Sequence, residues 1–204
     1  MRIIGGKYRG RILKMPKGVK IRPTQDKVRE AVFNIIKAGV PEARVLDLYA
    51  GSGAFGIEAL SRGAYSSIFV DNNIKCIRAI KSNLLALGDS ARLEGDRPKF
   101  EGGTGLSSAR GASLLVRLDG VRSISRFKRE NKKFDIIFLD PPYHEGLARN
   151  CLIKIDACDI LSQRGFAICE HFKKDIMPER IGNLLLFKNK RYGDTVLSFY
   201  RREK

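Results

Sequence analysis

The feature that most constrains the fold is a repeating alternation of short apolar runs and longer amphipathic stretches, which starts at Arg44. Strands buried on both faces read as nearly continuous apolar runs, whereas surface helices read as amphipathic segments. The alternation therefore predicts an α/β domain in which a mostly parallel sheet is covered by helices. The apolar runs of this part lie at 45–48, 68–70, 114–118, 134–139 and 166–169.

The C-terminal part follows a different pattern. The apolar runs 184–187 and 196–200 are separated by residues 189–194, which leave no room for a crossover helix. Strands joined by so short a connection pair antiparallel. We therefore expect an antiparallel hairpin at the sheet edge and a sheet of seven strands in all.

A glycine-rich turn joins the first predicted strand, 44–48, to a helix over 57–62 that ends at Gly63. Glycines let the backbone turn tightly and approach a ligand, and the helix N-terminus offers N–H groups to a carboxylate or phosphate. Asp71 ends the second predicted strand, where its carboxylate can hold both hydroxyls of a ribose. The pattern predicts a nucleoside-cofactor site. The turn itself reads Gly51-Ser52-Gly53-Ala54-Phe55-Gly56.

Asp47 distinguishes between possible cofactors because it stands just before the glycine turn. A dinucleotide would bring its diphosphate against this carboxylate, whereas S-adenosylmethionine would bring an amino group and a sulfonium cation. We therefore expect S-adenosylmethionine, with Asp119 placed to accept a hydrogen bond from its adenine amine. The candidate cofactor-binding residues are Asp47, Tyr49, Ala50, Gly51, Ser52, Gly53, Asp71, Asn72, Asp119 and Gly120.

The apolar run 134–139 ends in the tetrapeptide Asp140, Pro141, Pro142 and Tyr143, which we take as the catalytic residues. Ligands of open α/β sheets bind beyond the carboxyl ends of the strands, so the tetrapeptide should face the glycine turn. An exocyclic amine could donate hydrogen bonds to the Asp140 carboxylate and the Pro141 carbonyl while Tyr143 stacks on the base. The alternative is a rigid strand exit with a packed tyrosine. His144 is expected at the pocket rim and His171 elsewhere, and neither has metal-ligand spacing.

The charge of the chain indicates a polyanionic partner. Lys and Arg number 39 against 22 Asp and Glu, which gives a net charge of +17. Residues 1–29 hold ten basic residues and one acid, which is typical of a phosphate-binding surface, although scattered lysines can also serve solubility alone. We therefore divide the chain into a basic phosphate-binding extension, 1–23, and a catalytic domain, 24–204. The candidate residues for phosphate contacts are Arg9, Arg11, Lys14, Arg22 and Thr24, of which Thr24 can also cap the following helix.

Other classes of protein are disfavoured by composition. No apolar run approaches the roughly 20 residues of a membrane span, and the start of the chain does not resemble a secretory signal, so we expect a cytoplasmic protein without membrane contact. The four cysteines form no C-x-x-C pair, which argues against a disulfide framework or a zinc site. We expect no metal and a monomeric protein. The glycine-rich stretch 95–113 is expected to be a long loop.

With these motifs together, the chain resembles the RsmD-type family of 16S ribosomal RNA guanine-N2 methyltransferases. The resemblance rests on the opening residues 1–11, the segment 22–24, the glycine turn 47–56, residues 58–63 and the tetrapeptide 140–143. It implies a Rossmann-like class I methyltransferase fold, S-adenosylmethionine as cofactor, and methylation of the exocyclic N2 amine of one guanine in small-subunit RNA, within a partly assembled ribosomal subunit. It also implies that the basic extension, 1–23, and its candidate residues bind this RNA. The stretch from about 89 to 111 is longer and richer in glycine than the family pattern.

Three alternatives stay open at this point. A DNA adenine-N6 or cytosine-N4 methyltransferase would share the chemistry of the tetrapeptide, but it would need additional sequence to read bases in the major groove. An RNA-binding assembly factor could keep the fold without catalysis. A nicotinamide oxidoreductase is the remaining interpretation of the glycine motif.

Overall fold

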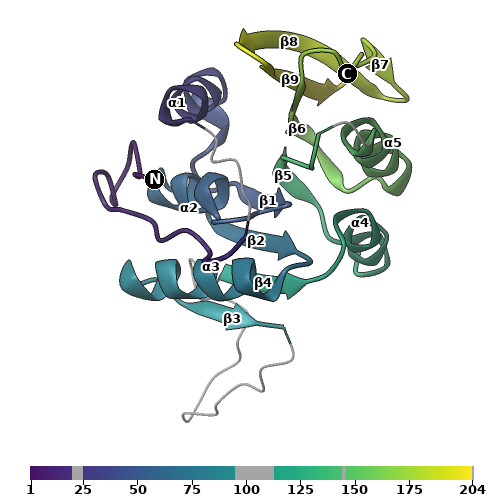
Figure 1. Cartoon of the computed structure of the whole chain (residues 1–204). Coiled ribbons are helices and arrows are strands. Elements are labelled where there is room, and N and C mark those ends of the chain that lie inside the picture. The colour runs from purple at the N-terminus through teal and green to yellow at the C-terminus, as the bar shows by residue number, and fades with distance from the viewer. Residues whose placement is uncertain (20–24, 95–112, 144–145, 204) are drawn as a thin grey trace.

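The computed structural model describes residues 1–19, 25–94, 113–143 and 146–203. It contains one nine-stranded sheet with the strand order β3-β4-β2-β1-β5-β6-β9-β8-β7 (Figure 1). The strands from β3 to β6 in this order run parallel, and β9, β8 and β7 continue the sheet antiparallel. The strands are β1 (Arg44–Leu48), β2 (Ser66–Asp71), β3 (Ala91–Leu93), β4 (Ser113–Arg117), β5 (Phe134–Leu139), β6 (Leu161–Phe172), β7 (Arg180–Ile181), β8 (Leu184–Tyr192) and β9 (Thr195–Arg202).

The helices cover both faces of the sheet. In Figure 1, α1, α2 and α3 lie on one side, whereas α4 and α5 lie on the other. Separate buried apolar clusters correspond to these layers, one formed by α4 and α5 and two formed by α1, α2 and α3. The helices are α1 (Asp26–Ile35), the 3₁₀ turn η1 (Lys37–Gly39), α2 (Ala54–Ser61), α3 (Ile74–Ala86), α4 (Gly120–Arg129) and α5 (Leu147–Cys158).

The predicted α/β class, the parallel sheet and the antiparallel C-terminal hairpin are confirmed. The expected strands all form, as β1, β2, β4, β5, β6, β8 and β9. The predicted count of seven is too low because β3 and β7 add two short strands at the edges of the sheet. These strands have only three and two residues, too few to show an alternating or continuous apolar pattern.

Helix starts differ from the sequence expectation at two places. Helix α2 begins at Ala54 rather than at residue 57, because Gly53 adopts a left-handed conformation (φ 79°) and caps the helix there. Helix α1 begins at Asp26 with Gln25 at its N-cap position, and Gln25 forms no side-chain cap hydrogen bond. The expected cap, Thr24, lies outside the described residues.

The strand register brings the ends of the central strands to one level. Leu48 at the end of β1 pairs with Val70 of β2 and with Leu139 of β5. Leu139 in turn pairs with Cys169 of β6. The residues that follow these positions therefore emerge along the same carboxyl edge, where α/β sheets bind ligands.

Several smaller expectations can be compared with the described residues. All four cysteines are free thiols. His171 is buried in β6, with its Nε2 2.8 Å from Ser198 Oγ and a pKa lowered mainly by burial. His144 and residues 95–112 of the glycine-rich stretch lie outside the described residues. No helix in the described part of the chain is long and apolar enough to cross a membrane.

Candidate active site

A cavity of about 700 Å³ opens at the carboxyl edge of the sheet. It brings the glycine turn and the tetrapeptide together, as the sequence analysis expected. Every predicted cofactor-binding and catalytic residue lines it except Gly53 and Gly120. The lining residues are Met1, Val19, Asp47, Tyr49, Ala50, Gly51, Ser52, Ala54, Phe55, Asp71, Asn72, Asn73, Cys76, Asp119, Asp140, Pro141, Pro142, Tyr143, Leu147 and Glu170.

Gly53 and Gly120 do not line the cavity, but their lack of a side chain permits close packing next to it. A Cβ on Gly53 would lie 3.1 Å from the Ile80 side chain, so this glycine allows α2 to pack on α3. A Cβ on Gly120 would lie 2.6 Å from Tyr49 Cζ, so the bare backbone there makes room for the Tyr49 ring. Both residues therefore shape the cavity through packing.

Asp71 holds the glycine turn in place. Its Oδ2 accepts a hydrogen bond from the Gly51 N–H at 2.9 Å, and its Oδ1 accepts one from the Asn73 N–H at 2.8 Å. Gly51 has a positive φ of 54°, as the tight turn requires. The Asp71 carboxylate thus fixes the backbone at the cavity edge and also faces the cavity.

Asp47 is the most deeply buried acid of the cavity, with 2% of its surface exposed. Its Oδ2 accepts a hydrogen bond from the Gly56 N–H at 2.9 Å. Burial raises the pKa of Asp47 to about 8, the Gly56 hydrogen bond opposes this shift, and the nearby Asp71 adds to it. A cation bound beside Asp47 would favour its charged form.

Asp119 combines two roles. It caps α4, since its carboxylate accepts a hydrogen bond from the Arg122 N–H at 2.9 Å. It also lines the cavity, which is the position expected for a contact to the adenine amine.

The cavity is acidic although the protein is strongly basic. Five acidic residues line it, and none of its described lining residues is a lysine or arginine. Such a surface repels a diphosphate and attracts a cation. This charge pattern agrees with an amino and sulfonium ligand and argues against a dinucleotide. The five acids are Asp47, Asp71, Asp119, Asp140 and Glu170.

The tetrapeptide lies where β5 leaves the sheet, next to β6. The Tyr143 hydroxyl donates a hydrogen bond to Glu170 Oε1 at 3.0 Å and lies 2.9 Å from Thr195 Oγ1. The Tyr143 ring centre is 6.0 Å from that of Phe172. Burial is the main cause of the raised pKa of Tyr143, so the phenol stays protonated at neutral pH. This ring is fixed at the cavity wall by its hydroxyl.

Some residues of the cavity wall were not predicted from the sequence. Glu170 directly follows the apolar run 166–169, just as Asp140 follows 134–139, and this shared pattern could have identified it. Cys76 could not be recognised from spacing, and burial raises the pKa of its thiol to about 12, which makes it a poor nucleophile. The other missed residues are Met1, Val19, Ala54, Phe55, Asn73 and Leu147.

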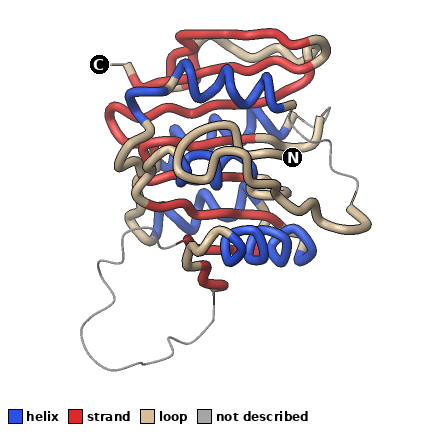
Figure 2. Tube along the Cα trace, turned by 90° about the vertical axis from the view of Figure 1, so that its left-hand side faces the viewer, coloured by secondary structure: helices blue, strands red, loops and turns tan. Residues whose placement is uncertain are grey.

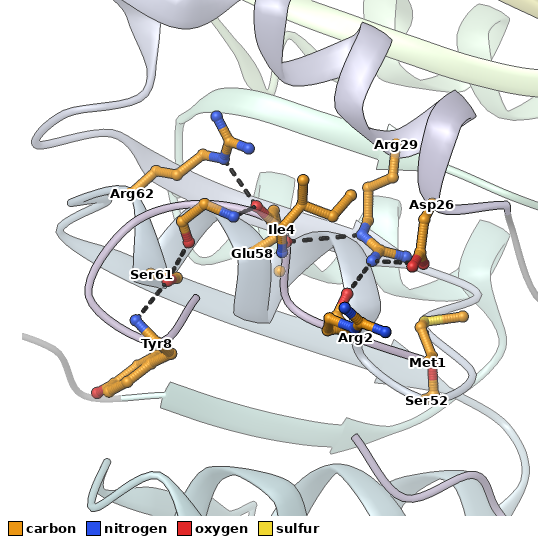
Figure 3. Close-up of polar contacts among 12 residues, drawn as sticks. Met1, Arg2, Ile4, Tyr8, Asp26, Arg29, Ser52, Glu58, Ser61 and Arg62 are labelled. Carbon is orange, nitrogen blue, oxygen red and sulfur yellow. Dashed lines mark hydrogen bonds and ion pairs between the residues drawn. The ribbon is translucent and has the colours of Figure 1, made fainter. Parts of the chain in front are cut away.

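The basic N-terminal segment, residues 1–19, which we call the arm, lies across the helices on one face (Figure 2). Figure 3 shows that Glu58 of α2 is the centre of its attachment. The Glu58 carboxylate accepts hydrogen bonds from the Ile4 and Gly5 N–H groups, both at 2.8 Å. It also pairs with Arg62 at 2.8 Å and lies 3.6 Å from Arg29 Nε. A fully buried carboxylate with these partners holds the arm firmly.

Two further side chains fasten the arm to α2 and α3. Ser61 Oγ accepts a hydrogen bond from the Tyr8 N–H at 2.9 Å and donates one to the Gly5 carbonyl at 2.6 Å. Asn83 of α3 bonds the backbone of Lys14 in both directions and also donates to the Ser52 carbonyl at 3.2 Å. The arm is therefore connected to the glycine turn through one buried amide.

The start of the arm reaches the cavity itself. Met1 lines the cavity, and its sulfur accepts a hydrogen bond from Ser52 Oγ at 3.7 Å. Ile3 and Leu13 of the arm are buried in the apolar cluster of α2 and α3. The arm thus contributes these two apolar side chains to the core of the catalytic domain.

The predicted RNA-binding residues of the arm point their charges outward. Arg9, Arg11 and Lys14 are exposed. Arg11 is held by a hydrogen bond to the Ala86 carbonyl at 3.3 Å. Arg22 and Thr24 lie outside the described residues.

Comparison with known proteins identifies the family. A family model described as "Conserved hypothetical protein 95" matches residues 1–100 and 106–201. The chain belongs to this family. The ranges that match the Conserved hypothetical protein 95 model include the arm and all described lining residues of the cavity. The unmatched residues 101–105 fall within the glycine-rich stretch that departs from the expected pattern.

Individual relatives of this family cover the whole chain. It is 37% identical over 202 residues to "Putative rRNA methyltransferase YlbH" of Bacillus subtilis, covering 99% of both chains. It is 28% identical over 203 residues to "Ribosomal RNA small subunit methyltransferase D" of Escherichia coli, covering all of this chain and 90% of that one.

Solved structures confirm the class I methyltransferase fold. The structure of "Putative methyltransferase yhhF" from Escherichia coli is 28% identical, with a TM-score of 0.77 over 100% of this chain and 98% of that one. SMU.776, complexed with SAH, is 16% identical and has a TM-score of 0.63, covering 95% of this chain and 52% of that one. At this identity the second likeness concerns the fold alone.

The close approach of Gly6 to α2 gives a prediction for the arm. A Cβ on Gly6 would lie 1.8 Å from the Ser61 carbonyl oxygen, whereas one on Gly10 would meet nothing within 4 Å. Both glycines have positive φ, 75° and 85°, so alanine is strained at either position. Gly6→Ala should lower the free energy of unfolding by about 1–3 kcal/mol more than Gly10→Ala, because only Gly6→Ala adds a clash. Urea unfolding of both variants measures the difference, and equal effects would contradict the described docking of the arm.

The raised pKa of Asp47 predicts a pH-dependent stability. The folded protein keeps the Asp47 proton up to pH of about 8, whereas the unfolded chain loses it near 3.8, so this group stabilises the fold at low pH and the contribution is lost as pH rises between these values. In protein without added ligand, the unfolding free energy of wild type minus that of Asp47→Asn should fall by at least ~1 kcal/mol between pH 5 and pH 8. Denaturant unfolding across this range checks the prediction. A difference that stays constant would show that Asp47 ionises normally.

Proposed function

We propose that this protein is an S-adenosylmethionine-dependent methyltransferase that methylates the exocyclic N2 amine of a guanine in small-subunit ribosomal RNA. The observation that carries the proposal is the single acidic cavity in which the glycine turn and the tetrapeptide 140–143 meet. Relatives named as ribosomal RNA methyltransferases, which match over nearly the whole chain, support the same substrate class.

The residues of the cavity fit S-adenosylmethionine by their chemistry. The carboxylate of Asp71 can accept hydrogen bonds from ribose hydroxyls, and Asp119 can accept one from the adenine amine. Asp47 lies beside the N-terminus of α2, so the ligand's amino group and carboxylate would meet an acid and helix N–H groups respectively. When bound, S-adenosylmethionine supplies a methyl group on a positively charged sulfur, which needs no further activation.

The acceptor side of the cavity orients the amine. The Asp140 carboxylate and the Pro141 carbonyl accept its two hydrogens, which directs the nitrogen lone pair at the methyl carbon. Methyl transfer would form the N–C bond as the S–C bond of the donor breaks, and the Asp140 carboxylate, which already accepts a hydrogen bond from the amine, would take the proton that the nitrogen releases. Because the methyl donor is already activated, positioning supplies most of the catalysis. The guanine has to leave its stack to enter the cavity, and Tyr143 offers a ring for it to stack on.

The observations favour this proposal over the alternatives. The acidic cavity argues against a nicotinamide cofactor. The cavity is lined by most of the predicted cofactor-binding residues and by the whole tetrapeptide 140–143, which argues against a non-catalytic assembly factor. The names of the relatives favour ribosomal RNA over DNA. We extend the proposal to a monomeric, cytoplasmic enzyme that acts within a partly assembled ribosomal subunit.

The RNA surface we propose combines the arm with α3. The arm runs along α3, since Lys14 contacts Asn83 and Arg11 contacts Ala86. Lys75 and Arg78 of α3 are also exposed and add to the charge of the arm. A continuous basic surface of this kind can follow an RNA backbone by contacts to phosphates.

Nucleoside mass spectrometry tests the proposed reaction. Small-subunit RNA from cells that lack this protein should lose one N2-methylguanosine, and wild type should restore it whereas Asp140→Ala should not. In calorimetry, Asp140→Ala should bind S-adenosylmethionine nearly as wild type does, whereas Asp71→Ala should bind it at least about tenfold more weakly, because only Asp71 holds the ribose. Unchanged N2-methylguanosine, or equal loss of affinity in both variants, would refute these assignments.

The exposed basic side chains of the arm should make a salt-dependent contribution to RNA binding. Replacing Arg9, Arg11 and Lys14 together with glutamine should reduce the slope of log affinity against log salt by about two to three, because each phosphate contact contributes roughly 0.7–0.9. The matched control removes equal charge from β8 with Lys188→Gln, Lys190→Gln and Arg191→Gln, which lie on an exposed segment near the other edge of the sheet. Filter binding to small-subunit RNA measures both slopes. A similar reduction in the control would mean that net charge alone explains the effect.

A further inference from the structure

Glu170 is a buried acid on the acceptor side of the cavity that the reaction described above does not use. It lies in β6, one residue beyond the Leu139–Cys169 pair, and is therefore level with Asp140. Only 6% of its surface is exposed, yet it lines the cavity together with Asp140 and Leu147.

The Glu170 carboxylate is held in a defined orientation. Tyr143 donates a hydrogen bond to its Oε1 at 3.0 Å, and the same hydroxyl lies 2.9 Å from Thr195 Oγ1 of β9. Both Asp140 and Glu170 contribute to the raised pKa of Tyr143, after the larger effect of burial, which places both acids close to this tyrosine. Glu170 is thus a fixed feature of the wall beside the catalytic tetrapeptide.

Two neighbouring acids make this part of the wall a pair of hydrogen-bond acceptors. Asp140 and Glu170 both line the cavity, on adjacent strands at the same level. A ligand group that directs two neighbouring N–H donors at them would form charge-assisted hydrogen bonds, whereas a ligand lone pair would be repelled.

The edge of guanine presents such donors. Its N1–H stands next to the 2-amine, so two neighbouring nitrogens can donate to the two neighbouring acids. Adenine and cytosine carry a ring nitrogen lone pair next to their amines, which a carboxylate would repel. We propose that Glu170 accepts a hydrogen bond from N1–H of the target base and thereby selects guanine, while Asp140 binds the 2-amine. This inference rests on the proposed function and adds the residue that determines which base is accepted.

An RNA with a single changed base tests the inference. Once the methylated position has been mapped with wild-type protein, a synthetic segment carrying 2-aminopurine at that position is ligated into unmodified small-subunit RNA. This base keeps the 2-amine but has no hydrogen on N1. Wild type should methylate the guanine RNA about 100-fold faster than the 2-aminopurine RNA under single-turnover conditions, because a charged hydrogen bond is lost and a buried acid meets a lone pair.

The variant Glu170→Gln should reverse this preference in part. An amide can donate to the unprotonated N1, so Glu170→Gln should lose at least about tenfold on guanine RNA and reduce the guanine to 2-aminopurine ratio at least about tenfold. The 2-aminopurine also lacks the 6-oxygen, but this affects both proteins equally. The change of ratio between the two proteins therefore reports on N1 alone.

Thr195→Val is the matched control, because it removes the Thr195 hydroxyl from the Tyr143 hydroxyl and leaves the Glu170 carboxylate in place. It should lower the methylation rate of both RNAs by the same factor and keep the wild-type ratio of guanine to 2-aminopurine rates. An unchanged ratio in Glu170→Gln would show that Glu170 only positions Tyr143 and would overturn the inference.

The wild-type comparison does not depend on how the variant folds. Wild type that methylates guanine RNA but accepts 2-aminopurine equally well would refute the role of Glu170 alone. Wild type that transfers no methyl group to guanine N2 would refute the proposed function instead.

Discussion

The parallel register of four neighbouring strands determines where the chemistry of this protein lies. Leu48 pairs with both Val70 and Leu139, and Leu139 pairs with Cys169, so β1, β2 and β5 end within one residue of the same level, and Cys169 of β6 lies at that level too. A shift of one residue in any of these pairings would turn the following side chain to the other face of the sheet. Four of the five acids share one cavity because the strands that carry or precede them, β1, β2, β5 and β6, fix this register.

This arrangement separates the charges of the protein into two surfaces. The excess of basic residues lies partly in the arm, whereas the cavity holds five acids among its described lining. A polyanion and a cationic ligand can therefore bind close to each other without competing for the same site. The folded backbone makes this possible because it places helix N–H groups and backbone donors against the buried carboxylates, as with Gly56 and Asp47 at 2.9 Å.

The sequence was sufficient to predict those parts of the fold and of the site that depend on a local pattern of residues. Apolar runs predicted seven of the nine strands, all except the short strands β3 and β7 at the sheet edges, and the position of Asp71 at the end of a predicted strand placed it at the cavity. It was insufficient where a role depends on a distant partner. Glu58 reads as an ordinary helical acid, and only the folded structure shows it beneath the Ile4 and Gly5 N–H groups. Gly53 matches a ligand-binding motif, but its missing side chain serves the packing of α2 on α3. Such roles are set by tertiary contacts that no periodicity records.

The same distant contacts connect the two surfaces. Asn83 donates to the Lys14 carbonyl at 3.0 Å and to the Ser52 carbonyl at 3.2 Å with one buried amide, and Ser52 in turn donates to the sulfur of Met1. A displacement of the arm would therefore break a hydrogen bond to the glycine turn, and it would also remove Met1 from the cavity wall. Since the arm carries exposed basic residues, whatever holds the arm in place also preserves the shape of the cavity. The arm and the cavity wall therefore share one set of buried contacts, which runs through Asn83, Ser52 and Met1.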